Sequence, residues 1–105
     1  MAKGVSPGQH FFIRTADGIT AMAVVEKWEA SGRVLVLHEG NQGEHTVSDY
    51  LTGMQCSHHK HKTTAKRLAE ETMAKAAERV ASGEFNWSTH AEINSPEFIA
   101  GWKAA

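Results

Sequence analysis

The sequence predicts an α+β fold: a small antiparallel β-meander, then one long amphipathic helix and a short C-terminal helix. Two observations lead to this class. Residues 9–47 contain strand-like runs separated by glycine-containing turns, and residues 64–82 keep a single helical period. The chain has 105 residues, of which 41% are hydrophobic and 22% charged, which is typical of one soluble domain spanning residues 1–105.

Strand-like runs rich in β-branched and aromatic residues occupy 9–15, 19–28, 33–39 and 44–47. The turns between them are Asp17-Gly18, Ser31-Gly32 and residues 40–43, where glycine accepts positive φ at no steric cost. Consecutive strands joined by tight turns form an antiparallel meander. By analogy of fold, a strongly bent meander of this size often curls into a small SH3-like or Sm-like barrel, so a partly closed barrel is one possible form of the sheet.

The second half of the chain is expected to be mainly helical. Ser48 and Gly53 suit the start and stop of a single turn, and Thr63 or Thr64 is expected to cap the main helix, which ends at Gly83. Residues 84–87 could add an edge strand, and residues 96–103 are expected to form a short helix behind Ser95. The expected core comprises Ile13, Val24, Val25, Leu35, Leu37, Leu68, Met73 and Val80.

Charge is distributed unevenly, although the net charge is only −1. Residues 50–69 hold four Lys or Arg and no acid, whereas the segments before and after them are acidic. The basic segment centres on CSHHKHKTTAKR (56–67), which also holds the single cysteine and three of the seven histidines. We consider three interpretations of it: a metal site, a polyanion-binding surface, and a solvated start of the main helix.

A metal site would use Cys56, His58, His59 and His61, because Cys and His are the preferred zinc ligands. In an extended strand, however, side chains alternate, so Cys56 and His58 would point away from His59 and His61. No paired C-x-x-C or H-x3-5-H spacing is present. A metal-binding module therefore remains an alternative, and we expect neither a metal nor another cofactor.

Nucleic-acid binding is a second alternative, because the lysines and Arg67 could neutralise phosphates. Phe11, Phe12 and Trp28 lie on strands where bases could stack on them, although core positions explain them more simply. No nucleophile elbow, Walker loop, H-E-x-x-H or C-x-x-C is present, so we do not expect an enzyme.

Small size, absent catalytic motifs and uneven surface charge resemble accessory proteins of phages and other mobile elements, including anti-CRISPR inhibitors. That resemblance implies a non-enzymatic inhibitor that occludes a surface of a protein or nucleoprotein complex. The expected partner-binding residues are His58, His59, Lys60, His61, Lys62, Lys66, Arg67, Trp87 and Trp102. No apolar run reaches the ~20 residues of a membrane span. The N-terminus carries no apolar signal segment. A lone cysteine fits a reducing compartment, so we expect a cytoplasmic protein.

Overall fold

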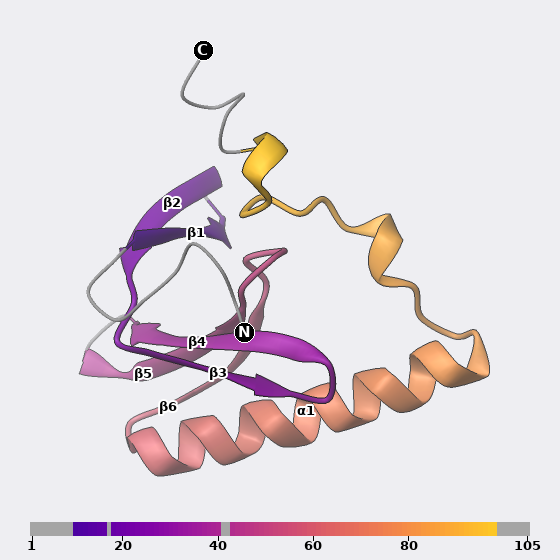
Figure 1. Cartoon of the computed structure of the whole chain (residues 1–105). Helices are drawn as coiled ribbons and strands as arrows, with labels where there is room; N and C mark the ends of the chain where they lie inside the picture. Colours follow the sequence, from indigo (N-terminus) through magenta and orange to yellow (C-terminus); the bar gives the residue numbers. More distant parts are fainter. Residues whose placement is uncertain (1–9, 17, 41–42, 99–105) are drawn as a thin grey trace.

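The computed structural model describes residues 10–16, 18–40 and 43–98, and it confirms the α+β class (Figure 1). A four-stranded antiparallel sheet forms the middle layer of the molecule. The long helix α1 (Lys62–Ser82) lies against one face of this sheet, and a β-hairpin lies on the other side (Figure 1).

The hairpin consists of β1 (His10–Thr15) and β2 (Gly18–Ala23), paired in register from His10↔Ala23 to Thr15↔Gly18. The predicted strand 19–28 ends early, because the chain leaves the hairpin at Val24 and Val25 and enters the other sheet. The Val25 N–H donates to the Leu37 carbonyl, 2.9 Å away, at the point where the second sheet begins.

The central sheet has the order β3-β4-β5-β6, with strands Glu26–Ala30, Arg33–Glu39, His45–Asp49 and Gln55–His59. The β3–β4 turn has positive φ at Ser31 (52°) and Gly32 (78°), as the Ser-Gly signal predicts. Strand β6 was not predicted, because its sequence QCSHH lacks the β-branched and aromatic residues by which strands are recognised. The two sheets remain separate in the described part of the chain, so the strands do not close into a barrel.

The stretch 48–54 contains the predicted single helical turn, in which the Gly53 N–H donates to the Asp49 carbonyl at 2.8 Å, but the side chain that caps it through the Thr52 N–H is Asp49 and not Ser48. Ser48 and Asp49 belong to β5, and the chain then turns through Gly53, which has φ of 70°. Helix α1 starts after His61, which supplies no side-chain cap, so the predicted threonine cap is also wrong. Its end is as predicted: Gly83 is left-handed, with φ of 84°, and its N–H bonds back to the last turn.

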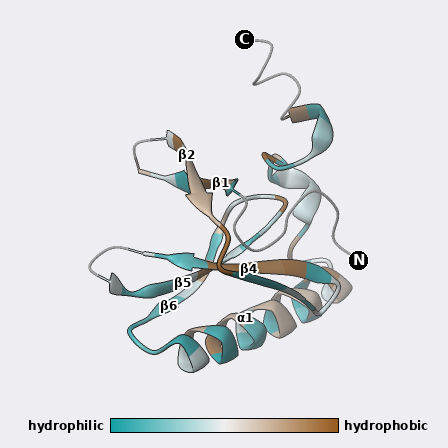
Figure 2. Cartoon of the chain, turned by 60° about the vertical axis from the view of Figure 1, so that its left-hand side comes forward, coloured by the Kyte–Doolittle hydropathy of each residue, from teal (hydrophilic) through white to brown (hydrophobic). Residues whose placement is uncertain are grey.

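The core has one part on each face of the sheet, and Leu35 and Leu37 face α1 whereas Val34 and Val36 face the hairpin. The helix-side cluster contains Leu35, Leu37, Val47, Ala65, Ala69 and Met73. The hairpin-side cluster contains Phe11, Val24, Val36 and Tyr50. Figure 2 shows the most hydrophobic ribbon along β4, between the two clusters.

The predicted core is confirmed at Val24, Leu35, Leu37 and Met73. Ile13 and Leu68 are only half-buried. Val25 and Val80 are wrong, with 48% and 42% of their surface exposed. Val25 lies where the chain crosses between sheets, and Val80 lies in the last turn of α1, whose end extends past the sheet (Figure 1).

After α1 the chain runs back towards the hairpin through the 3-10 helix Trp87–Thr89, which replaces the predicted strand at 84–87. Residues 96–98 are helical, as predicted, and the other positions of the predicted helix 96–103, with Trp102, lie outside the described residues. No helix in the described ranges combines the length and apolar character that a bilayer crossing requires.

Candidate functional site

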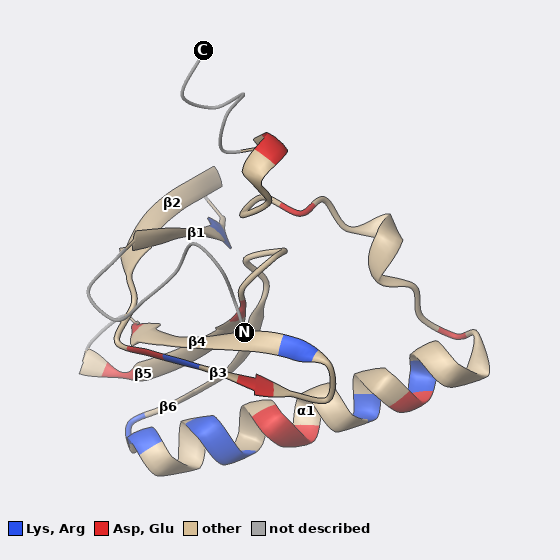
Figure 3. Cartoon of the chain, in the orientation of Figure 1, with Lys and Arg blue, Asp and Glu red and all other residues tan. Residues whose placement is uncertain are grey.

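Seven of the nine predicted partner-binding residues lie where β6 meets α1. We call this surface the basic strip: His58, His59, Lys60, His61, Lys62, Lys66 and Arg67. It covers the end of β6, a two-residue turn and the first turns of α1. Strip side chains other than His59 and Lys66 are exposed. Figure 3 shows this concentration of blue at the start of α1.

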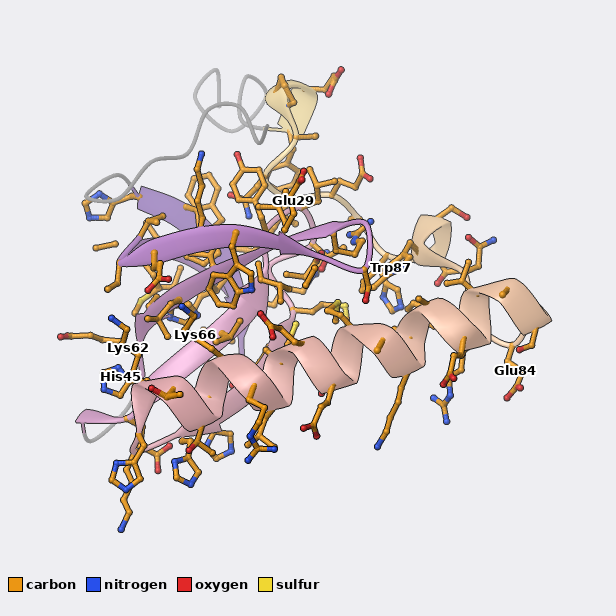
Figure 4. All side chains as sticks on the ribbon, turned by 60° about the horizontal axis from the view of Figure 1, so that its bottom comes forward. Glu29, His45, Lys62, Lys66, Glu84 and Trp87 are labelled. Atoms are coloured by element: carbon orange, nitrogen blue, oxygen red, sulfur yellow. The ribbon has the colours of Figure 1, made fainter. Side chains whose placement is uncertain are left out.

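Trp87 is not part of the strip. Figure 4 places Trp87 near the other end of α1 from Lys62 and Lys66. Its ring packs against the helix-side core, and the Arg33 guanidinium lies 3.9 Å from the ring centroid. The structure therefore gives Trp87 a packing role, and Trp102 lies outside the described residues.

Acids that are distant in sequence neutralise much of the strip. Glu26 of β3 pairs with Lys66 and, at 3.6 Å, with Lys62. The hydrogen bond from Lys66 is the main reason that the pKa of the Glu26 carboxyl lies below its ordinary value. The sequence shows no acid between Asp49 and Glu70, but the fold supplies one from β3.

Two further pairs lie at the margins of the strip, one local to α1 and one between neighbouring strands. Arg67 donates to Glu71 at 2.8 Å, and His58 Nδ1 lies 2.9 Å from the Glu44 carboxylate. Lys60 is the one strip lysine or arginine that forms no ion pair with a described residue. The strip is thus a surface of mixed charge with Lys60 at its exposed turn.

Histidines gather beside this turn. His45 on β5 is the cross-strand partner of His59, and the His59 and His61 rings lie 5.3 Å apart. The His61 backbone N–H donates to His59 Nδ1 at 3.0 Å, so this ring nitrogen is an acceptor. Within the described residues, no group of three or more His, Cys, Asp or Glu side chains is arranged to hold a metal ion.

Cys56 is separated from these histidines by a β-bulge. Val47 pairs with Ser57 and Ser48 pairs with Gln55, so Cys56 is the extra residue. It packs against the helix-side core, whereas His58 is exposed beside Glu44. The expected common orientation of Cys56 and His58 is therefore wrong, because the bulge interrupts the alternation. Burial, together with the charge of Asp49, raises the pKa of the Cys56 thiol to about 12. The side chain is therefore a protonated thiol at neutral pH and not a nucleophilic thiolate.

Trp28 joins the strip to the sheet. Its indole N–H donates to Glu70 on α1 at 2.9 Å, and the Lys66 ammonium lies 4.9 Å from its ring centroid. Such cation–π contacts contribute about 0.5–1 kcal/mol at exposed sites. These contacts attach the first half of α1 to β3.

Sequence reasoning missed two buried polar groups. Arg33 makes a two-bond contact with Asp49, with bonds of 2.9 and 2.7 Å, and Asp49 also accepts from the hydroxyl and N–H of Thr52. Asp49 is only 1% exposed, so this pair stabilises the β5–β6 turn rather than binding a ligand. In the sequence Asp49 lies two residues beyond the predicted strand 44–47 and 16 residues from Arg33, and no local pattern links the two.

The second missed group is a Ser–His pair on neighbouring strands. His38 Nε2 lies 2.8 Å from Ser48 Oγ, and His38 Nδ1 lies 3.0 Å from the Glu39 carbonyl. Since a carbonyl only accepts, Nδ1 carries the proton and Ser48 donates to Nε2. Burial lowers the pKa of His38, which favours this neutral form. Both side chains are at most 2% exposed, so the pair is closed to a substrate.

Comparison with known proteins adds no relative: no family model, curated protein or solved structure matches the chain.

Proposed function

We propose that this protein is a non-enzymatic binding protein that occludes a surface of a protein or nucleoprotein partner through the basic strip. This proposal matches the way in which many accessory proteins of phages and mobile elements act, including anti-CRISPR proteins, which inhibit a partner by binding to it. The observation that carries it is the arrangement of charge on the strip, whose cations are mostly ion-paired with acids.

A mosaic of alternating charge suits a protein surface. Complementary charges steer encounter and set the register of two proteins, and they discriminate against wrong partners. The strip offers Lys60 and His61 at an exposed turn, with Glu44 and Glu71 at its margins. We therefore propose a partner patch whose acids meet this turn and whose cations meet the margins.

A bare nucleic acid fits the strip less well. Binding to phosphates depends on cations that release counterions, and here Lys62, Lys66 and Arg67 already have carboxylate partners. Phe11 is 3% exposed and Trp28 is half-buried beneath Lys66, so neither offers a stacking face for a base. These contacts favour a protein surface, or the protein part of a nucleoprotein, as the direct contact.

The test uses the double substitution Lys60→Glu with Lys62→Glu in a pull-down from bacterial lysate, with and without nuclease. Both side chains are exposed and the Lys62–Glu26 pair is long, so folding stability is expected to change by less than about 1 kcal/mol. Capture of the partner is expected to fall, most strongly at low salt, where exposed charges are least screened.

The matched control is Lys75→Glu with Arg79→Glu, which makes the same change of charge on exposed residues of the far half of α1. This control should capture the partner as wild type does. Equal capture by wild type and by the Lys60/Lys62 variant at every salt concentration would contradict the proposal. The strip would then be only the solvated start of α1. Capture that disappears on nuclease treatment would assign the contact to nucleic acid instead.

A further inference from the structure

The outer edge of β2 differs from the outer edge of β1. In an antiparallel pair, alternate residues point their backbone N–H and C=O away from the partner strand. On β1 these outward groups are used: Phe12 bonds to the Asn94 amide through both N–H and C=O, and the Arg14 N–H donates to Gly53. The hairpin register places Ala21 opposite Phe12 and Ile19 opposite Arg14. Ala21 and Ile19 therefore point their backbone groups outward on β2, and by alternation so does Ala23.

No described residue bonds to these outward groups of β2. The backbone bonds outside the regular pairing contain none from Ile19, Ala21 or Ala23, and Ala21 and Ala23 are exposed. The strand GITAMA carries neither a charge nor a proline, and Figure 3 shows β2 without blue or red. Free sheet edges are normally protected by charged residues, prolines or bulges, because an unprotected edge pairs with another strand.

We propose that β2 pairs antiparallel with β2 of a second copy of this chain, about a two-fold axis at Ala21. In this register Ala21 faces Ala21 of the other copy, and Ile19 faces Ala23 at both ends. All three facing pairs consist of residues with outward N–H and C=O, so each exchanges two hydrogen bonds. The register is self-complementary, as the same patch on both partners of a two-fold dimer must be.

The pairing also adds further strands to the two-stranded sheet of the hairpin. A two-stranded sheet is marginally stable alone, and three or more strands are more secure. Joining two hairpins gives one continuous sheet of order β1-β2-β2-β1. The absence of charge between Gly18 and Ala23 leaves no repulsion when the strand meets its own copy, and the alanines leave room for close approach.

The experiment measures the mass of the protein by sedimentation equilibrium over a range of concentration. Wild type is expected to show a dimer whose fraction rises with concentration. Ala21→Lys and Ala21→Glu each place like charges opposite one another at the axis, which should weaken the dimer by about tenfold or more. An equimolar mixture of the two variants should recover the dimer, because the ammonium of one variant then faces the carboxylate of the other across the axis.

The matched control is Ala77→Lys, which adds the same charge at an exposed alanine of α1. It should dimerise as wild type does, and far-UV circular dichroism should show that all variants are folded. As an independent measurement, Ala21→Cys should form a covalent dimer under mild oxidation. Residues facing each other in a hydrogen-bonded pair have Cα atoms about 5.5 Å apart, within reach of a disulfide.

Three results would each overturn the proposal. The first is wild type that stays monomeric at the highest concentration, without a cross-link in the Ala21→Cys variant. The second is Ala77→Lys dissociating the dimer as much as Ala21→Lys. The third is a mixture of the Ala21→Lys and Ala21→Glu variants that remains monomeric while wild type dimerises.

Discussion

The two faces of the central sheet are held by different kinds of contact. On the helix side, leucine, valine, alanine and methionine side chains interdigitate, and six buried apolar residues form one cluster. On the hairpin side, the buried apolar set is smaller, and side-chain hydrogen bonds to the backbone fasten the layer. The first face depends on burial of apolar area, and the second depends on the geometry of a few polar groups.

Asn94 is the centre of the side-chain hydrogen bonds that hold the hairpin layer on the sheet. It is 2% exposed, and its amide bonds to the N–H and C=O of Phe12 at 2.8 Å each and to the Tyr50 carbonyl at 2.6 Å. Its own N–H donates to Leu51. One side chain therefore acts as a short piece of strand that joins β1 to the turn after β5.

This difference shows how each face should fail. Removing atoms from the apolar face leaves a cavity, whose cost grows with its volume. Disturbing the polar fastening leaves buried donors and acceptors without partners, or forces backbones apart. The following substitutions test the contrast from the largest expected effect to the smallest.

Gly53→Ala is expected to cause the largest loss of stability. A Cβ at Gly53 would lie 2.6 Å from Ile93 Cδ1 and 2.7 Å from the Phe12 carbonyl oxygen, and φ is +70°. Backbone strain and the clash with β1 together should cost about 3 kcal/mol or more, measured by urea unfolding. The control is Gly83→Ala, which has φ of +84° but no atom within 4 Å of its Cβ.

Because Gly83→Ala carries only the conformational strain, it should cost about 1–2 kcal/mol. Equal losses for the two variants would mean that Gly53 is required for its φ alone. The close approach between the turn and β1 would then contribute nothing to holding the hairpin layer.

Met73→Ala and Val80→Ala compare the packed and the extending parts of α1. Met73 is 4% exposed within the helix-side cluster, so its truncation should cost roughly 2–4 kcal/mol. Val80 is 42% exposed, and alanine favours helices, so its truncation should change stability by less than about 0.5 kcal/mol. Half-buried Leu68 should fall between them. Similar thermal shifts for Met73→Ala and Val80→Ala would show that α1 is covered along its whole length.

The helix-side face was predictable because its contacts follow sequence periods. Alternation placed Leu35 and Leu37 together on one face of β4, and the helical period placed Met73 on the buried stripe of α1. The same period failed at Val80, because a period shows which side of a helix is apolar but not how far the sheet extends beneath it.

The hairpin-side face and much of the site could not be predicted. The bond between Asn94 and Phe12 spans 82 positions, and no local pattern marks it. The bulge at Cys56 and the pairing of Glu26 with Lys66 likewise depend on strand register and on helix placement. The charge run did locate the exposed turn at Lys60, but Glu26, the acid that pairs with Lys62 and Lys66, became visible only in the fold.

The smallest expected effect is a pH dependence of stability that arises between the two faces, at His38. Its ring packs edge-on against Phe11 of the hairpin, 5.4 Å between centroids, and it accepts a hydrogen bond from Ser48 of the sheet. Burial lowers the pKa of His38 in the folded protein below the ordinary value of about 6.5. The unfolded chain therefore binds this proton first as the pH falls. The stabilising contribution of His38 is complete above about pH 6.5 and decreases below it. The slope of stability against pH that it causes corresponds to at most one proton taken up on unfolding.

Urea unfolding at a series of pH values from about 7 down to about 5 measures this slope. His38→Gln should lower stability at every pH but remove the His38 part of the slope. The control His45→Gln replaces a half-buried histidine on β5 and should keep that part. Glu26 does not confuse the result, because its lowered pKa costs stability only as the pH falls through the ordinary carboxyl value of 4.5, which lies below this range. If His38→Gln retains the wild-type slope, the proton uptake on unfolding belongs to other histidines. The contribution of His38 to stability would then come from its packing against Phe11 rather than from the hydrogen bond that its neutral Nε2 accepts from Ser48.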